Sequence, residues 1–394
     1  MRKQLLKSFF ASVKSVSFAV VYWDGEQANY GDEQPAVKVI FKKPLPLTFN
    51  LEDPVLSFGE AYMDEIVDFE GDLDVIFKAV ELNKDGAFCG LAGKAAAVVK
   101  ALSGAAAKLK QKSNIQHHYD LGNEFFSLWL DETMSYSCAY FKTIGDSLYQ
   151  AQLQKIDHIL KKIQLRPGER LLDIGSGWGW LIIKAAQEYG AQALGITLSE
   201  EQYRATKERV KKLNLEKQVD VKLVNYQDLD EQEYQFDKIV SVGMFEHVGK
   251  DNLPVYMDRV KKLLVPGGVS MLHTITGMWE KPVDSWIEQY IFPGGYIPSL
   301  RETVWLLPEY DFHLLHAESL RLHYAMTLDR WYENFLRHVD TVEQKYGRRF
   351  VRMWELYLRS CASSFRVSGL NIYQLLFSKG LNNNWPLTME HIYR

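Results

Sequence analysis

Apolar runs of strand length alternate with longer amphipathic segments through the middle of the chain. The apolar runs cover residues 169–175, 191–198, 220–226, 237–243 and 268–276. The segments between them, such as WLIIKAAQEYG and SEEQYRATKERVKKL, carry apolar residues at helical spacing. Strands buried on both faces of a parallel sheet have such runs, and helices connect them in βαβ units. The pattern therefore predicts an α/β fold with a doubly wound, Rossmann-like sheet.

The N-terminal residues 1–90 show a different pattern, typical of a small α+β domain. An amphipathic start, LLKSFFASV, precedes the strand-like runs VSFAVVYW, AVKVIF and LTFN, with Gly, Asp and Pro turn signals between them. Residues 91–113 are rich in Ala, Gly and Lys, as in a linker. We therefore expect a domain over residues 1–90, a linker over 91–113 and a larger domain over 114–394. A chain of 394 residues, 47% of them hydrophobic, is long enough for two cores.

Charge and cysteine content limit the partners and the compartment. The formal net charge of −4 gives no general attraction to nucleic acid, which we do not expect as a partner, or to a membrane. The three cysteines lie far apart in the sequence, which favours a reducing cytosol over a disulfide framework. We see no signal peptide pattern, and no run approaches the length of about 20 apolar residues that spans a bilayer. We expect a cytoplasmic protein with at most peripheral membrane contact.

A glycine-rich loop, LLDIGSGWGW, joins the first apolar run to the helix that follows it. Asp173, Gly175 and Gly177 belong to this loop. Glycines there let a ligand approach the backbone and present the N–H groups of the helix start. A dinucleotide fingerprint would need a third glycine at position 180, where the chain has Trp180. The D-x-G-x-G-x-G spacing favours S-adenosylmethionine over NAD, with an ordinary tight turn as the alternative.

Polar side chains follow the second predicted strand, in GITLSEEQ. This stretch offers Thr197, Ser199 and Gln202 in place of the acidic residue that usually meets a nucleotide ribose. Ser199 and Gln202 also match a helix capping box, S-x-x-Q. Ligand contact and helix capping are both open interpretations here.

Two further strand ends carry polar groups that a buried strand does not need for packing. Glu246 and His247 follow DKIVSVG, and His273 lies near the end of GVSMLHTIT. Ligands of doubly wound sheets bind outside the carboxyl ends of the strands, so these positions are candidates for a site. Adjacent residues at a strand end usually point in different directions, so we interpret His247 as supporting or structural.

Six ordered motifs, from about residue 114 to the C-terminus, resemble the cyclopropane fatty acyl phospholipid synthases and the related mycolic acid cyclopropane synthases. The motifs are HHYDLGNEFFSLWLDETMSYSCAYF, LLDIGSGWG, GITLSEEQ, GMFEHVG, LHTITG and YIFPGGYIPS. The resemblance implies an S-adenosylmethionine-dependent methyltransferase domain. Its reaction adds the methyl carbon of S-adenosylmethionine across a cis double bond of a phospholipid acyl chain, and a ring closes after proton loss.

The resemblance also implies catalytic residues. In the family a bound bicarbonate takes the proton, and by motif its holders here are Cys138, Glu246, His273 and Tyr324, together with the backbone N–H of Ile275. An aromatic-rich stretch over residues 276–336 suits a dry pocket that shelters a cation, although core packing is an alternative for each ring. Cys361 is a secondary catalytic candidate, with packing as its alternative role. No metal is expected.

The cofactor residues follow from the same motifs. They are Tyr136, Ser137, Asp173, Gly175, Gly177, Thr197, Leu198, Gln202, Tyr226 and Gln227. Many relatives have an aromatic residue followed by an acid where this chain has Tyr226 and Gln227, so the chain departs from the family pattern at an expected contact to adenine.

Membrane contact, assembly and alternatives complete the expectations. The basic stretch KYGRRFVRMW is a candidate for contact with anionic headgroups or a solvated face, and WIEQYIFPGGYIPSL is a candidate lid or an ordinary loop. We expect reversible membrane association, aided by the N-terminal domain, and a possible homodimer. The alternatives are methyl branching of the acyl chain, methylation of a small amine, and a lipid-binding protein with a degenerate cofactor site.

Overall fold

The computed structural model describes residues 2–83 and 122–393 and divides the chain into two compact units. The first unit comprises Met1–Lys108, Val283–Pro293 and Trp331–Leu370, and the second comprises Leu109–Pro282, Gly294–Arg330 and Asn371–Arg394. The N-terminal segment therefore folds together with two stretches from later in the chain. The expected linker over residues 91–113 lies outside the described residues.

The first unit contains a four-stranded sheet in the order β2–β1–β3–β4. β1 and β3 are parallel, and the other two pairs are antiparallel. The bounds are α1 (Arg2–Ser12), β1 (Phe18–Val21), β2 (Gln27–Tyr30), β3 (Val37–Phe41), α2 (Pro54–Met63), β4 (Val67–Gly71) and α3 (Leu73–Leu82). Its core is rich in aromatic side chains, among them Phe10, Tyr22 and Phe41. The expected small α+β domain is confirmed.

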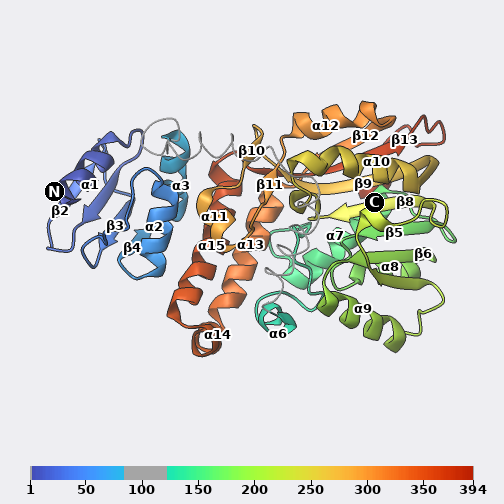
Figure 1. Ribbon diagram of the computed structural model, residues 1–394, viewed down its shortest axis with the longest axis horizontal. Coiled ribbons are helices and arrows are strands. Elements are labelled where there is room, and N and C mark those ends of the chain that lie inside the picture. Colours follow the sequence, from blue (N-terminus) through green and yellow to red (C-terminus); the bar gives the residue numbers. More distant parts are fainter. Residues whose placement is uncertain (1, 84–121, 394) are drawn as a thin grey trace. The chain divides into compact units, whose positions relative to one another are not determined.

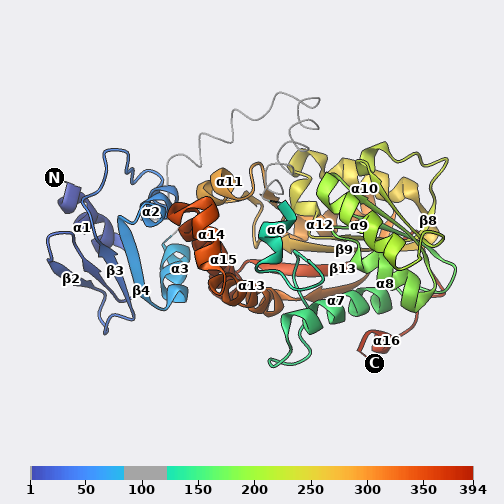
Figure 2. The same ribbon diagram turned by 90° about the horizontal axis from the view of Figure 1, so that it is seen from below.

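Three later helices also belong to the first unit: α11 (Ser285–Tyr290), α14 (Val339–Tyr346) and α15 (Arg348–Val367). α15 lies beside α2 and α3 (Figure 2). The buried Arg352 donates to the carbonyl oxygens of Tyr62 and Val67 at 2.5 and 3.1 Å. Arg349 Nε lies 2.7 Å from a carboxylate oxygen of Asp64. The arginines of the KYGRRFVRMW stretch thus contribute to contacts within this unit.

The second unit contains a seven-stranded sheet in the order β12–β13–β9–β8–β5–β6–β7. β13 pairs antiparallel with both of its neighbours, and the other pairs are parallel. The strands are β5 (Arg170–Ile174), β6 (Gln192–Thr197), β7 (Val219–Leu223), β8 (Phe236–Val242), β9 (Leu264–Thr276), β12 (Phe312–Ser319) and β13 (Asn371–Lys379), with the short pair β10 (Lys281–Pro282) and β11 (Tyr296–Ile297) outside the sheet. The predicted doubly wound sheet is confirmed.

Helices cover both faces of this sheet. α7, α8 and α9 lie on one side and α10 and α12 on the other (Figure 1). The helices are α6 (Gly122–Ser127), α7 (Leu148–Lys162), α8 (Trp180–Tyr189), α9 (Glu200–Lys212), α10 (Leu253–Leu263), α12 (Leu300–Glu309) and α16 (Glu390–Tyr393), and α13 (Arg321–Leu336) begins in this unit. Helix connections leave β5 toward β6 over one face and β8 toward β9 over the other, so the strand order reverses between β5 and β8. Such a switch point is where doubly wound sheets bind ligands.

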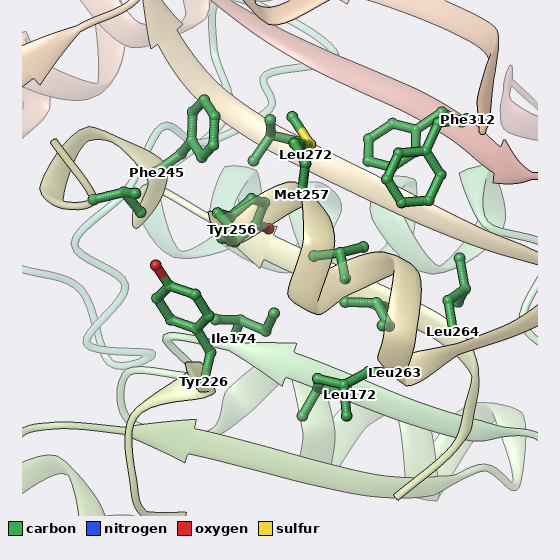
Figure 3. Close-up of a cluster of buried hydrophobic side chains, with 14 of the residues drawn as sticks. Leu172, Ile174, Tyr226, Phe245, Tyr256, Met257, Leu263, Leu264, Leu272 and Phe312 are labelled. Carbon is green, nitrogen blue, oxygen red and sulfur yellow. The ribbon is translucent and has the colours of Figure 1, made fainter. Parts of the chain in front are cut away.

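Apolar side chains fill both sides of the sheet. On the α10 side, Leu172, Ile174 and Leu272 pack against Tyr256 and Met257 (Figure 3). On the opposite side, alternate residues of the same strands pack against α7 and α8, because successive side chains of a strand point to opposite faces. Within the described residues, no helix has the length and apolar content needed to cross a bilayer.

Candidate active site

A cavity of about 140 Å³ opens at the carboxyl ends of β5, β6 and β8. Gly175 and Gly177, in the loop after β5, line it with positive φ angles of 84° and 54°. A Cβ atom on Gly175 would also lie 3.0 Å from Met244, so glycine is needed at this position for both conformation and space. The loop thus forms a backbone cradle at the switch point of the sheet.

The cavity brings together the predicted cofactor residues, except Gln227. Those that line it are Tyr136, Ser137, Asp173, Gly175, Gly177, Thr197, Leu198, Gln202 and Tyr226. Gln227 instead lies beside its neighbour, with its side-chain amide 3.2 Å from the Tyr226 hydroxyl. Gln227 is also the residue that departs from the family pattern, which has an acid at this position.

Both interpretations of the GITLSEEQ stretch have structural support. Ser199 caps α9, because its hydroxyl accepts from the Gln202 N–H at 3.3 Å. The Gln202 side chain turns back and accepts from the Thr197 hydroxyl at 2.7 Å. Helix capping therefore positions Gln202, and the Gln202 side chain in turn positions Thr197, which also lines the cavity.

A buried carboxylate and a buried ammonium group border the cavity. Asp173 Oδ1 is buried and has no hydrogen-bond partner, and burial raises the pKa of Asp173 to about 7, although the nearby Lys155 opposes this rise. Lys155, on α7, donates to the Ser137 hydroxyl at 2.9 Å, and burial lowers its pKa to about 8. A ligand that carries both an ammonium and a carboxylate, as the methionine part of S-adenosylmethionine does, fits this pair. Sequence reasoning did not find Lys155.

Glu246 lies in the short helix η2 (Phe245–His247), directly after β8. Its Oε1 accepts from the Ile275 N–H at 2.6 Å, whereas its Oε2 is buried without a partner. Burial raises the pKa of Glu246 to about 7. The Ile275 N–H, expected to bind an anion, therefore orients the carboxylate in this structure. His247 lines the cofactor cavity instead, and burial lowers its pKa to about 4.

His273 lies on β9, opposite Val242, the last residue of β8, so it is level with the end of the strand that leads to Glu246. Its ring is buried, and its Nε2 has no hydrogen-bond partner. Burial and the positive charges of Lys155 and Lys162 hold its pKa well below the usual value. A neutral imidazole on β9 and a carboxyl group just after β8 thus each have one buried, unsatisfied polar atom.

Cys138 and Tyr324 connect to these strand ends through Leu320. The Leu320 N–H donates to Ile372, which lies opposite Ile275 in the sheet. The Leu320 carbonyl accepts from the Tyr324 N–H at 3.1 Å and lies 3.9 Å from the Cys138 sulfur. Burial raises the pKa of Cys138 far above its usual value, so the group remains a thiol. Four candidate catalytic residues therefore come from segments that contact one another within the second unit.

Cys361 does not share this unit. It lies on α15 of the first unit, and burial raises its pKa to about 12, so it has little thiolate character. The aromatic residues of 276–336 do not form one cluster, because they lie in different units and differ in burial. Phe312 packs in the core of the second unit, Trp286 donates to the Met63 sulfur in the first unit, and Trp305 is 75% exposed.

α7 carries a row of buried polar side chains that sequence reasoning missed. We define this row as the α7 polar stripe, formed by Gln152, Lys155, His158 and Lys162. Gln152 donates to the Ser137 carbonyl at 2.9 Å and so positions a cavity segment. Polar residues at helical spacing within an apolar helix face were the available signal. In the described part of the chain, no group of three or more His, Cys, Asp or Glu side chains is arranged to hold a metal ion.

Comparison with known proteins agrees with this geometry. A family model described as mycolic acid cyclopropane synthetase matches residues 106–375, and a domain of unknown function matches residues 5–90. A probable fatty acid methyltransferase of Pseudomonas putida is 36% identical over 385 residues, which are 94% of this chain and 95% of that protein. The cyclopropane-fatty-acyl-phospholipid synthase of Escherichia coli strain K12 is 42% identical over 269 residues, 68% of each chain.

This chain is also similar to solved structures. The mycolic acid cyclopropane synthase CmaA1, complexed with SAH and CTAB, superposes with a TM-score of 0.64 at 33% identity and covers 68% of this chain and 98% of its own. The glycine cradle, the buried charges beside it and these matches lead to one conclusion. The chain belongs to the mycolic acid cyclopropane synthetase family and is an S-adenosylmethionine-dependent methyltransferase.

Proposed function

We propose that this enzyme adds a methylene unit from S-adenosylmethionine to the cis double bond of unsaturated phospholipid acyl chains. The E. coli relative, a cyclopropane-fatty-acyl-phospholipid synthase, supports the substrate class. The observation that carries the proposal is the pair of buried, unsatisfied atoms Glu246 Oε2 and His273 Nε2. His247, the sequence neighbour of Glu246, and Val242, the strand partner of His273, line the cavity. Methylation of an amine also requires a proton acceptor, so the preference for a lipid substrate rests on the lipid-modifying relatives.

The residues around the cavity orient the cofactor. When bound, S-adenosylmethionine supplies an electrophilic methyl group to the alkene, which is a weak nucleophile. Asp173 and Lys155 hold opposite charges on the cavity wall, and the Gly175–Gly177 backbone lets the ligand approach closely. Positioning of this kind lowers the barrier because the two reactants meet in a fixed geometry without competing water.

The remaining site residues suit a small anion that carries one hydroxyl group. When bound, bicarbonate accepts the proton that the cationic acyl chain loses. Glu246 Oε2 would accept the hydroxyl proton of this anion, and His273 Nε2 would donate to one of its oxygens. Tyr324 and the Cys138 thiol are additional donors in the proposed site. The Ile275 N–H donates to Glu246 Oε1 at 2.6 Å, which fixes the orientation of the carboxylate.

The P. putida relative favours a second candidate function, methyl branching of the acyl chain. That probable fatty acid methyltransferase matches 94% of this chain. Both reactions begin with the same methyl transfer to a double bond and differ in the fate of the cation. Ring closure gives a cyclopropane, whereas proton loss without closure gives a branched alkene of the same mass.

Incubation with defined vesicles distinguishes these reactions. The enzyme, S-adenosylmethionine and vesicles of phospholipid with cis-monounsaturated chains are incubated in CO₂-free buffer, with and without added bicarbonate. We expect acyl chains that have gained one CH₂ group, resist ozonolysis and form faster with bicarbonate. Ozone-sensitive chains of that mass would indicate methyl branching. Product formation that does not respond to bicarbonate would refute the anion's role, and unchanged chains would refute both functions.

Acyl chains of phospholipids lie within a bilayer, so the proposed substrate requires reversible contact of a cytoplasmic enzyme with a membrane. We assign part of this contact to the N-terminal domain and propose that the enzyme assembles as a homodimer. Flotation of the enzyme with the same vesicles tests membrane contact. Sedimentation equilibrium of the lipid-free enzyme tests the dimer, and a monomer mass at micromolar concentration would exclude it.

A further inference from the structure

Three polar side chains lie side by side across the antiparallel edge of the large sheet. Glu318 of β12 is opposite Gln374 of β13, and Gln374 is opposite His273 of β9. Directly opposed residues of neighbouring strands share one face of a sheet. This face is the one that α7 covers, and Lys162, at the end of the α7 polar stripe, contacts Glu318 and Gln374.

Short hydrogen bonds join these groups into a continuous chain. Lys162 Nζ lies 2.5 Å from both Glu318 Oε2 and Gln374 Oε1. Gln374 Nε2 lies 3.1 Å from His273 Nδ1. At the outer end, His158 Nε2 lies 2.7 Å from Glu318 Oε2. Gln374, Lys162 and His273 are fully buried, so water does not compete for these contacts.

The donor and acceptor roles of these side chains allow only one arrangement of their hydrogen bonds. An ammonium group only donates, so the atom of Gln374 that faces Lys162 is the carbonyl oxygen. The amide NH₂ then faces His273, and because an amide NH₂ also only donates, His273 Nδ1 must accept. A neutral imidazole with an accepting Nδ1 carries its single proton on Nε2. This is the nitrogen that is buried without a partner.

We infer that Lys162 and Gln374 are positioning residues that fix the tautomer of His273, so that its N–H group points into the reactive space as a hydrogen-bond donor. The inference rests on the proposed function in one respect: a bound anion needs a donor at Nε2. Glu318 completes the chain by balancing the charge of Lys162. An ion pair of this kind is often no more stabilising than apolar residues of the same volume, so its value here lies in orientation.

Gln374→Glu tests the inference with almost no change of shape. The new carboxylate still accepts from Lys162, but toward His273 it now accepts instead of donating. We expect ¹⁵N NMR of histidine-labelled enzyme to show an unprotonated Nδ1 in the parent and a protonated Nδ1 in the variant. The signal of His273, one of ten histidines, is assigned by its loss in His273→Gln. Gln192→Glu, an exposed position at the start of β6, is the matched control and leaves the spectrum unchanged.

Activity provides the second measurement. At pH values where the ring is neutral, we expect Gln374→Glu to lose about 10- to 100-fold in kcat/KM, as other ligand-orienting groups do, with the affinity for S-adenosylmethionine retained. If Gln374→Glu does not fold, Gln374→Met serves, and a mixture of the two tautomers is expected. A protonated Nδ1 in the parent, or an unprotonated Nδ1 in Gln374→Glu, would overturn the inference. If the enzyme shows the predicted tautomers but forms no cyclopropane, the positioning of His273 by Lys162 and Gln374 would be supported. Only the proposed function would then be refuted.

Discussion

Replacement of Glu246 by glutamine should make the protein more stable and the enzyme far less active. In the folded protein, burial raises the pKa of Glu246 from 4.5 to about 7. Between these two values the unfolded chain loses the proton and the folded protein keeps it. The free energy of unfolding therefore falls as pH rises through this window, and above pH 7 the loss is complete.

The magnitude follows from the pKa difference. Each tenfold change in proton affinity corresponds to 1.36 kcal/mol, so the rise of Glu246 from 4.5 to about 7 costs about 3 kcal/mol of stability at high pH. A glutamine does not ionise and avoids this cost. Its oxygen can keep the Ile275 N–H bond, but its NH₂ group then replaces the accepting Oε2. An acceptor for the anion becomes a donor, and we expect a loss of at least about 100-fold in kcat.

Urea denaturation at about pH 4.5 and about pH 8 measures the first effect. The difference between Glu246→Gln and the parent should be small at the lower pH and approach 3 kcal/mol at the higher pH. Glu216→Gln, at an exposed position before β7, controls for the loss of one negative charge. Calorimetry should show unchanged affinity for S-adenosylmethionine. A variant that is no more stable at about pH 8, or that loses cofactor affinity together with activity, would contradict this account of Glu246.

Three other predictions test separate parts of the structure. Asp173→Asn should lower the affinity for S-adenosylmethionine about 10-fold or more, as measured by calorimetry. In the parent, this affinity should fall as the pH drops below about 7, because Asp173 then becomes protonated. Cys361→Ser should keep nearly full activity. In the parent, Cys361 should react slowly with iodoacetamide at about pH 8, because burial raises its pKa to about 12. Rapid labelling of Cys361, or loss of activity in the variant, would argue for a catalytic thiol. Gly195→Ala should destabilise the second unit by about 1 to 3 kcal/mol, as measured by urea denaturation. The reason is that a Cβ atom at this position would lie 2.6 Å from Ser176 and 2.8 Å from Ile182. An unchanged denaturation midpoint would show that α8 can shift.

Local sequence patterns were sufficient to predict the doubly wound sheet and the glycine loop that lines the cavity. The run 169–175 is β5 (Arg170–Ile174) and the run 191–198 is β6 (Gln192–Thr197), because a buried strand needs an unbroken apolar stretch wherever it lies in the sheet. The glycines after β5 were equally readable, since their positive φ angles are a property of a few adjacent residues. The strand ends at Glu246 and His273 followed from topology, because parallel strands place their carboxyl ends at one edge.

The partners of those groups depend on contacts between distant parts of the chain. Lys155 and Lys162 appear in sequence as ordinary helix lysines, and only the packing of α7 on the sheet buries them beside Asp173 and Gln374. The basic stretch of α15 was predicted as a headgroup site or a solvated face, whereas Arg352 is buried and bonds to backbone carbonyls nearly 300 positions away.

The sequence by itself thus determined which segments form strands, which glycine loop lines the cavity and which polar residues lie near the strand ends, because these depend on neighbours within one or two turns of chain. The tertiary structure alone decided the charge state and the hydrogen-bond direction of each site residue. Those properties depend on burial and on facing side chains that come from separate elements, as His273 and Gln374 show.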